Sequence, residues 1–292
     1  MTARIPRRWT TTSRLCRPRG DSAQRWSALS LAYDLLNATD RFLGEASITY
    51  RDRQLAHLRA QLDRDMRDAF YSQGEIFTGK LQPALPGWEG LFEEAAEETE
   101  DLFVKPIVRT IKLSLTIGGD AMWRAAQIVG SFDLANPLAV RYVAEHGAKL
   151  VAGINDTTRD YLRTVIQKGV DEGWSYDRIA KAITERYDEF AVGRPQKHID
   201  SRAHGIAVTE TGMAYEAGNR IVAESLGGYG LDMEKSWLTA QDDDVCTDEC
   251  LKNEAQGWIP MQEPFSSGHQ QPLAHPYCRC AALYRRKPGA NR

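Results

Sequence analysis

Four cysteines near the C-terminal end of the chain have the residue type and spacing of metal ligands. Cys246 and Cys250 are four residues apart, about one helical turn, and Cys278 and Cys280 are two residues apart, the side-chain repeat of a strand. Either spacing directs both sulfur atoms of a pair to one side. Thiolates are preferred ligands of zinc, so the four cysteines could form a tetrahedral site in which His275 replaces one of them.

Two other states of these cysteines stay open. The first 20 residues lack the apolar run of a secretory signal, which predicts a reducing compartment and favours metal-bound thiolates over disulfides. The intervals within the two pairs differ, however, from the two-residue interval of the commonest zinc knuckle. We therefore expect one structural zinc ion, with two disulfides or four free thiols as the alternatives.

Glu210 is a further residue whose position suggests a chemical role. It falls on the apolar stripe of a predicted long helix, four residues after Ile206 and three before Met213. A carboxylate on that stripe would be buried, and an unpaired buried charge costs several kcal/mol. We predict that Glu210 is structural and has a partner on a neighbouring element. A general acid or base with a raised pKa is the alternative.

Other motifs of catalytic chemistry are weak or missing. Asp242, Asp243 and Asp244 could hold a hard cation, but no glycine turn or distal glutamate follows at the spacing of a calcium loop. A solvated turn or a helix cap is favoured for this run. A phosphate-binding glycine loop, a nucleophile elbow and a dinucleotide fingerprint are all missing. The sequence therefore predicts that the protein is not an enzyme.

Basic residues gather at both ends of a chain that is slightly acidic as a whole. Its 37 Lys and Arg against 40 Asp and Glu give a net charge of -3, which argues against a uniformly basic surface. Any contact with DNA must therefore be local. The candidate DNA-contact residues are Arg4, Arg7, Arg8, Arg14, Arg17 and Arg19 at one end and Arg285, Arg286 and Lys287 at the other.

Helices are expected to position most of these residues. Apolar side chains recur at helical spacing over residues 51–71 and, for a shorter stretch, over residues 22–36. The helix that carries Glu210 is expected to begin near Pro195 and to end near Ser225.

Glycine, proline and capping residues are expected to divide the helical region. Pro106 predicts a kink or a break, and the glycine pair 118–119 predicts a helix boundary. The Asn-Pro pair 136–137 is a further such boundary, and the Asn-Asp pair 155–156 and Ser175 have the residue types that cap helix starts. The resulting helices are short, with a domain boundary near residue 150.

Beyond residue 228 the helical period gives way to Gly, Pro, Gln, Asp and Cys. The apolar runs 235–239 and 279–284 are predicted to be strands of a hairpin or small sheet beside the cysteines. The predicted fold class is mainly α (α+β). The expected parts are a basic flexible tail (1–21), a helical N-terminal domain (22–150), a helical domain (151–284) that ends in a cysteine-rich β module (237–284), and a basic tail (285–292).

Composition places the chain among ordinary globular proteins. Hydrophobic residues make up 42% of it and charged residues 26%, values far from those of disordered or collagenous chains. No apolar run approaches the length of a membrane-spanning helix, so no membrane association is expected.

An ordered set of motifs over residues 150–284 resembles a known family. The motifs are Gly169-x3-Gly173-x-Ser175, Ile179-Ala180-x2-Ile183, Ala203-x2-Ile206-Ala207-x-Thr209-Glu210, Trp237-x-Thr239-x2-Asp242 and His275-Pro-x-Cys278-Arg279-Cys280. In order and spacing they are similar to the C-terminal domain of the phage Mu F-like minor head morphogenesis proteins. The first 150 residues show no such resemblance.

The resemblance implies a minor capsid protein of a tailed bacteriophage. Such a protein is expected in the virion, inside the capsid near the portal vertex, and in the host cytoplasm during assembly. Its implied partners are the portal protein, the major capsid or scaffold proteins, and packaged DNA at the basic ends. Its implied role is in procapsid assembly and in DNA packaging or ejection, and the family is not known for enzymes.

Two other function classes are kept as alternatives. An ADP-ribosyltransferase-like or nuclease domain centred on Glu210 and the acidic run at Asp242 would turn over nicotinamide dinucleotide or DNA, but few recognisable catalytic parts are present. A cellular zinc-binding DNA module would fit the arginine-rich ends but not the net charge of -3.

Overall fold

The described part of the chain forms two compact units. The computed structural model describes residues 48–81, 87–126, 128–191, 202–240 and 248–288. One unit, which we call the bundle unit, contains residues 60–109 and 142–207. The other, which we call the sheet unit, contains residues 48–59, 110–141 and 208–288. The predicted helix 22–36 and the N-terminal tail lie outside the described residues.

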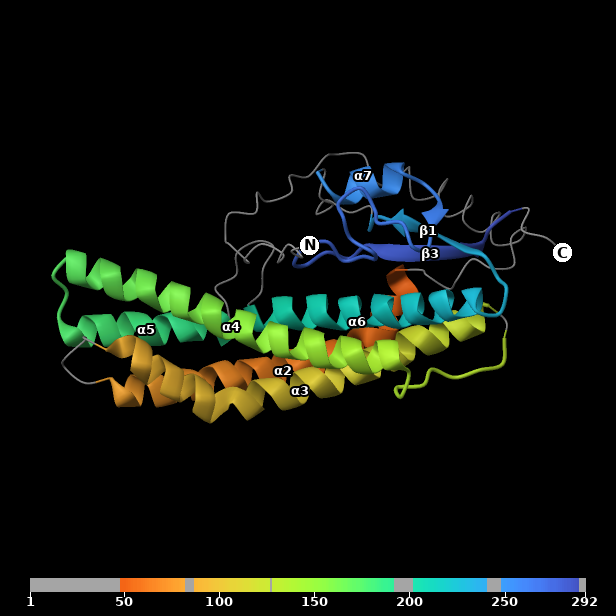
Figure 1. Cartoon of the computed structure of the whole chain (residues 1–292). Helices are drawn as coiled ribbons and strands as arrows, with labels where there is room; N and C mark the ends of the chain where they lie inside the picture. The colour runs from red at the N-terminus through yellow and green to blue at the C-terminus, as the bar shows by residue number, and fades with distance from the viewer. Residues whose placement is uncertain (1–47, 82–86, 127, 192–201, 241–247, 289–292) are drawn as a thin grey trace, which may run out of the picture. The chain divides into compact units, whose positions relative to one another are not determined.

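Helices dominate both units, which confirms the predicted mainly α fold class. The helices are α2 (Ile48–Lys80), α3 (Trp88–Ala125), α4 (Pro137–Asp171), α5 (Tyr176–Ala191), α6 (Arg202–Gly227) and α7 (Cys250–Ala255), and the strands are β1 (Met233–Leu238), β2 (Ile259–Pro260) and β3 (Ala281–Arg286). Figure 1 shows this element order along the chain. None of the described helices is both long enough and apolar enough to span a membrane.

α3 is one continuous helix, so the predicted alternative of a break at Pro106 and the predicted boundary at residues 118–119 are wrong. The glycines serve close packing within the sheet unit instead. A Cβ on Gly118 would overlap the backbone carbonyl of Tyr215 on α6, and a Cβ on Gly218 would overlap that of Leu115 on α3. The two helices therefore meet at backbone contact, which only residues without a side chain allow.

α4 begins at the boundary predicted for residues 136–137, and Ser175 caps the start of α5 as predicted. Asn136 and Ser175 each accept a hydrogen bond from a backbone N–H in the first turn of the helix that follows. α4 then runs without a break past residue 150 and past the pair 155–156, so the predicted helix start at that pair is wrong. Asn155 instead accepts a hydrogen bond from the buried side chain of Gln73 at 3.2 Å, inside the bundle unit.

Aromatic side chains fill the interior of the bundle unit. The ring of Phe70 on α2 lies 5.3 Å from that of Phe103 on α3 and 5.6 Å from that of Phe190 on α5. The guanidinium of Arg202 lies 5.0 Å from both Phe70 and Phe190 and donates to the carbonyl of Ile154. Burial lowers the pKa of Arg202 to about 10. These contacts build an aromatic core inside the bundle unit.

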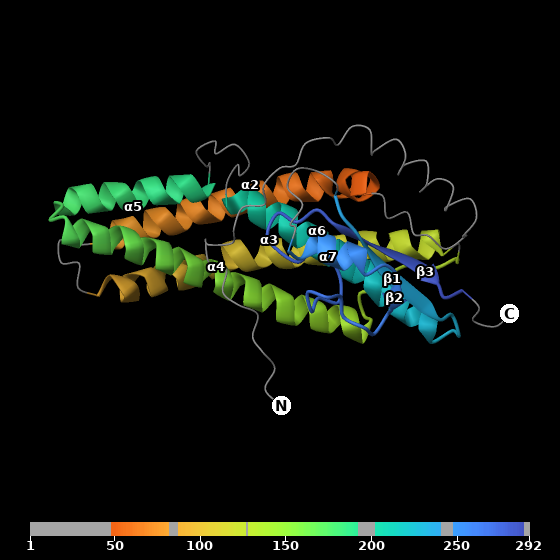
Figure 2. The ribbon, with the colours of Figure 1, turned by 90° about the horizontal axis from the view of Figure 1, so that it is seen from above.

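A three-stranded antiparallel sheet of order β2-β1-β3 forms the C-terminal part of the sheet unit. β1 and β3 pair from Met233↔Arg286 to Leu238↔Ala281, close to the two predicted strands. The two-residue strand β2 was not predicted. In Figures 1 and 2 the sheet and α7 lie along one side of α6. Because β3 is an edge strand, its outer edge must find hydrogen-bond partners outside the sheet.

Candidate metal centre

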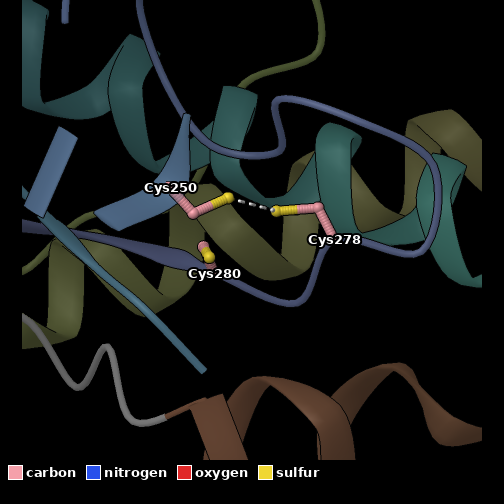
Figure 3. A group of neighbouring side chains, drawn as sticks. All are labelled: Cys250, Cys278 and Cys280. Carbon is pink, nitrogen blue, oxygen red and sulfur yellow. Dashed lines mark hydrogen bonds between the residues drawn. The ribbon is translucent and has the colours of Figure 1, made fainter. Parts of the chain in front are cut away.

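Three buried cysteines, Cys250, Cys278 and Cys280, lie together in the sheet unit. Their sulfur atoms are all within 4.8 Å of one another, and the Sγ atoms of Cys250 and Cys278 are 3.8 Å apart. Figure 3 shows these two side chains directed toward each other, with Cys280 beside them. All three are free thiols, and together they could hold a metal ion. Cys246, the fourth predicted cysteine ligand, lies outside the described residues.

Different elements bring the three thiols together. Cys250 is the first residue of α7, and the other two cysteines directly precede β3. Their pair was predicted to lie on a strand, but β3 begins only after Cys280. Trp237 of β1 and Phe265 pack in the same apolar cluster as the cysteines, with ring centroids 5.0 Å apart in an edge-to-face contact. The apolar cluster excludes water from the sulfur atoms.

His275 lies beside the thiols on a loop that α6 anchors. Its Nε2 is 3.4 Å from the sulfur of Cys250, and its Nδ1 is 2.8 Å from the carbonyl oxygen of Pro276. If Nδ1–H donates to that carbonyl, the lone pair of Nε2 stays available to a metal. The N–H of Tyr277 donates to the hydroxyl of Thr209 at 3.0 Å, which fixes this loop. Thr209 of the Thr-Glu motif therefore supports the centre.

The three clustered thiols shift one another's pKa in different directions. Hydrogen bonding with Cys250 and Cys280 lowers the pKa of Cys278, and the nearby His275 adds to this shift. Hydrogen bonding to the sulfur of Cys278 raises the pKa of Cys250. The hydrogen bond with Cys250 works to lower the pKa of Cys280, but Cys278 and burial outweigh it and raise this pKa to about 12. A bound cation would favour the deprotonated form of all three thiols.

A buried ion pair joins the cysteine segment to two helices. Nη1 of Arg51 on α2 and Oε1 of Glu216 on α6 are 3.0 Å apart, and each side chain is 1% exposed. Arg51 also donates to the carbonyl oxygens of Arg279 and Cys280, at 2.7 and 2.6 Å. Oε2 of Glu216 accepts the N–H of Ala282 at 3.1 Å. Burial raises the pKa of Glu216, although Arg51 opposes the shift.

Sequence analysis missed this ion pair. Arg51 precedes Leu55 by four residues and so continues the apolar stripe of α2, while Glu216 follows Met213 by three residues on the stripe of α6. Opposite charges on the apolar stripes of two helices were the available signal. A buried charge needs a partner, and each of these helices supplies the partner of the other.

Glu210, the carboxylate that was predicted to be buried, is 1% exposed. The position of the helical stripe therefore predicted its burial correctly. Its structural role, as opposed to general acid or base chemistry, stays a prediction. The acidic run of residues 242–244 lies outside the described residues.

The basic residues near the C-terminal end are only partly available for DNA. Arg285 and Arg286 belong to β3 instead of a tail that begins at residue 285. Arg285 pairs with Glu234 of β1 at 2.9 Å and lies over the ring of Trp258 at 4.2 Å. The side chain of Arg285 is therefore occupied by contacts within the sheet unit, whereas the side chain of Lys287 is exposed. The six N-terminal arginines lie outside the described residues.

Comparison with protein families finds a match in the C-terminal part of the chain. Residues 160–283 are similar to the Phage Mu protein F like family. The matched segment includes α5, α6, β1 and the three clustered cysteines, and the match confirms the resemblance carried by the motifs. Arg51 lies outside the matched segment and Glu216 inside it. No curated protein and no solved structure shows significant similarity to the chain.

Proposed function

We propose that this protein is a minor head protein of a tailed bacteriophage that lies inside the capsid near the portal vertex. The match of residues 160–283 to the Mu F-like family is the observation that carries the proposal, because that family suggests head morphogenesis and association with the virion. Portal, major capsid or scaffold proteins would be its partners during assembly. It would act in procapsid assembly and in DNA packaging or ejection, without catalysis of its own.

The proposal is tested in the phage that encodes the protein. A nonsense mutation in its gene should reduce the yield of filled heads, and expression of the full chain from a plasmid should restore it. Electron microscopy of purified heads should then place density for the protein at one vertex, in full particles and not in particles made without it. Normal heads of normal infectivity from the mutant, or turnover of nicotinamide dinucleotide or DNA by the purified protein, would contradict it.

We further propose that the cysteine centre binds zinc as a structural ion. Two thiolates at about 2.3 Å from a tetrahedral zinc ion lie about 3.8 Å apart, and a thiolate and an imidazole nitrogen lie about 3.5 Å apart. The distances of 3.8 Å between Cys250 and Cys278 and of 3.4 Å between Cys250 and His275 fit that arrangement. Cys280 would be the third thiolate, and His275 or Cys246 would complete the site. Zinc would then hold together a loop-rich module whose apolar cluster surrounds the cysteines.

Metal analysis of protein purified under reducing conditions should find about one zinc ion per chain. Replacement of Cys278 or Cys250 by Ser should lose this zinc and part of the folded signal, because structural zinc contributes on the order of 10 kcal/mol to such sites. Cys16→Ser is the matched control and should keep the metal. Protein without zinc that also keeps its fold in the presence of a strong chelator would overturn the zinc assignment and leave packed thiols.

A further inference from the structure

The segment 279–282 carries the ligand candidate Cys280 and has one edge outside the sheet. β3 pairs with β1 on one side only, because the strand order is β2-β1-β3. On a strand, the C=O of one residue and the N–H of the residue two positions later point to the same side. The C=O of Cys280 and the N–H of Ala282 therefore share the outer edge, which none of the described strands pairs with.

Arg51 and Glu216 take the place of that missing strand. The guanidinium donates to the carbonyl oxygens of Arg279 and Cys280, and the carboxylate accepts the N–H of Ala282. The salt bridge of 3.0 Å between the two side chains fixes the donor and the acceptor relative to each other. The pair thus offers this edge both donor and acceptor, as a neighbouring strand would.

The cost of this arrangement indicates a specific role. Removing two charges from water is expensive, and a buried pair is often no more stabilising than apolar residues of similar volume. What an apolar pair would not supply is the set of directed hydrogen bonds to residues 279–282. Arg51 and Glu216 therefore differ from an apolar core pair in one respect: their hydrogen bonds fix the backbone that carries Cys280.

We propose that Arg51 and Glu216 are positioning residues of the metal centre. They hold the backbone of residues 279–282 so that the thiolate of Cys280 points at the sulfur atoms of Cys250 and Cys278. By reciprocity, a metal bound to Cys280 strengthens the docking of this segment on α2 and α6. The proposal rests on the metal centre proposed above, and it adds a contribution from α2, which lies outside the matched domain.

The experiment compares metal binding by full-length variants under reducing conditions, with Co(II) and Zn(II) as the probes. The main variant is Arg51→Met/Glu216→Leu, which removes both charges and leaves neither one unpaired. The matched control is Lys235→Met, which removes a buried charge from β1 whose Nζ donates to Gln270 and not to residues 279–282. Affinity is measured by competition with a chromophoric chelator, ligand geometry by the Co(II) absorption bands, and folding by circular dichroism.

The double variant should keep its helical signal but bind both metals 10–100-fold more weakly, about the range for residues that orient metal ligands. Its Co(II) bands should also shift, whereas Lys235→Met should keep the affinity and the bands of the natural protein. A folded double variant with unchanged affinity and unchanged bands would overturn the proposal. Failure of the natural protein itself to bind either metal would instead show that the metal centre is wrong.

A second variant covers the case in which the double variant does not fold. Arg51→Lys keeps the charge opposite Glu216 but cannot present the planar fork that reaches two carbonyl oxygens at once. It should weaken metal binding and shift the Co(II) bands in the same direction. Natural affinity and natural bands in Arg51→Lys would overturn the proposal without any help from the double variant.

Discussion

Buried charges in the sheet unit are satisfied in two different ways. Arg51 and Glu216 form an ion pair that also binds backbone groups. Lys235, with none of its side chain exposed, has neutral partners instead. Its Nζ donates to the backbone carbonyl and to the side-chain oxygen of Gln270, at 2.9 and 2.8 Å, and lies 5.0 Å from the ring of Phe265. A buried cation that has no hydrogen-bonded carboxylate should make the free energy of unfolding depend on pH.

Lys235→Met should remove a pH dependence of stability. Burial lowers the pKa of Lys235 from 10.5 to about 8, and Arg220 adds to the shift. Between these two pH values the unfolded chain binds the extra proton, so the free energy of unfolding should rise with pH. The rise is at most about 1.4 kcal/mol per pH unit. Urea titrations from pH 7.5 to 10.5 check it, with reducing agent and metal held constant.

The exposed residue Lys287 supplies the control for this measurement. Lys287→Met also removes one lysine but leaves Lys235 in place, so this variant should keep the rise in stability. A rise of equal slope in Lys235→Met would show that another group titrates.

At the scale of elements, glycines let the backbones of α3 and α6 meet where the two helices cross. Gly118 and Gly218 each face the backbone of the opposite helix, so a side chain at either position cannot be absorbed by a change of rotamer. Overpacking of a core typically costs about 1–3 kcal/mol. The contact is specific, since Gly153 inside α4 has open space around it.

Gly118→Ala should lower the free energy of unfolding by about 1–3 kcal/mol or more, although alanine is the better helix former. Gly153→Ala should do the opposite and raise stability by up to about 1 kcal/mol, because only the helix propensity changes. Thermal or denaturant unfolding of the two variants checks both signs. A neutral or stabilising Gly118→Ala would show that α3 and α6 do not cross at backbone contact.

At the scale of the whole molecule, parts outside the matched domain supply groups that the domain lacks. Residues 160–283 contain the cysteines and Glu216, but the arginine that completes the ion pair comes from α2. The six arginines at Arg4, Arg7, Arg8, Arg14, Arg17 and Arg19 also lie outside the match. In a head filled with DNA, a basic segment could neutralise phosphates without reading sequence.

Replacement of these six arginines by serine should weaken DNA binding and flatten its salt dependence. Each lost phosphate contact should reduce the slope of log affinity against log salt by about 0.9. Replacement by lysine is the matched control and should keep the slope, because it preserves the charge. The C-terminal residues Arg285 and Arg286 are left intact, since they belong to β3. Unchanged affinity and slope in the serine variant would exclude DNA contact by this segment.

The sequence alone determined the features that depend on local periodicity and on residue type. The apolar stripe of α2, the helix boundary at residues 136–137, the Ser175 cap and the two main strands follow from rules that act within a few residues. The motif order also predicted the family that residues 160–283 match, and the gathering of cysteines near the C-terminal end predicted a shared site, where Cys250, Cys278 and Cys280 do come together.

Tertiary structure decided what local rules leave ambiguous. The glycine pair 118–119 has the composition of a helix end, yet it lies inside α3 because close packing against α6 outweighs helix propensity. Asn155 has the composition of a cap, yet it lies inside α4 and accepts a hydrogen bond from Gln73. The partnership of Arg51 and Glu216 joins residues 165 positions apart. Each charge on its apolar stripe is visible in the sequence, but the pairing of the two is not, because only the folded chain brings the two stripes together.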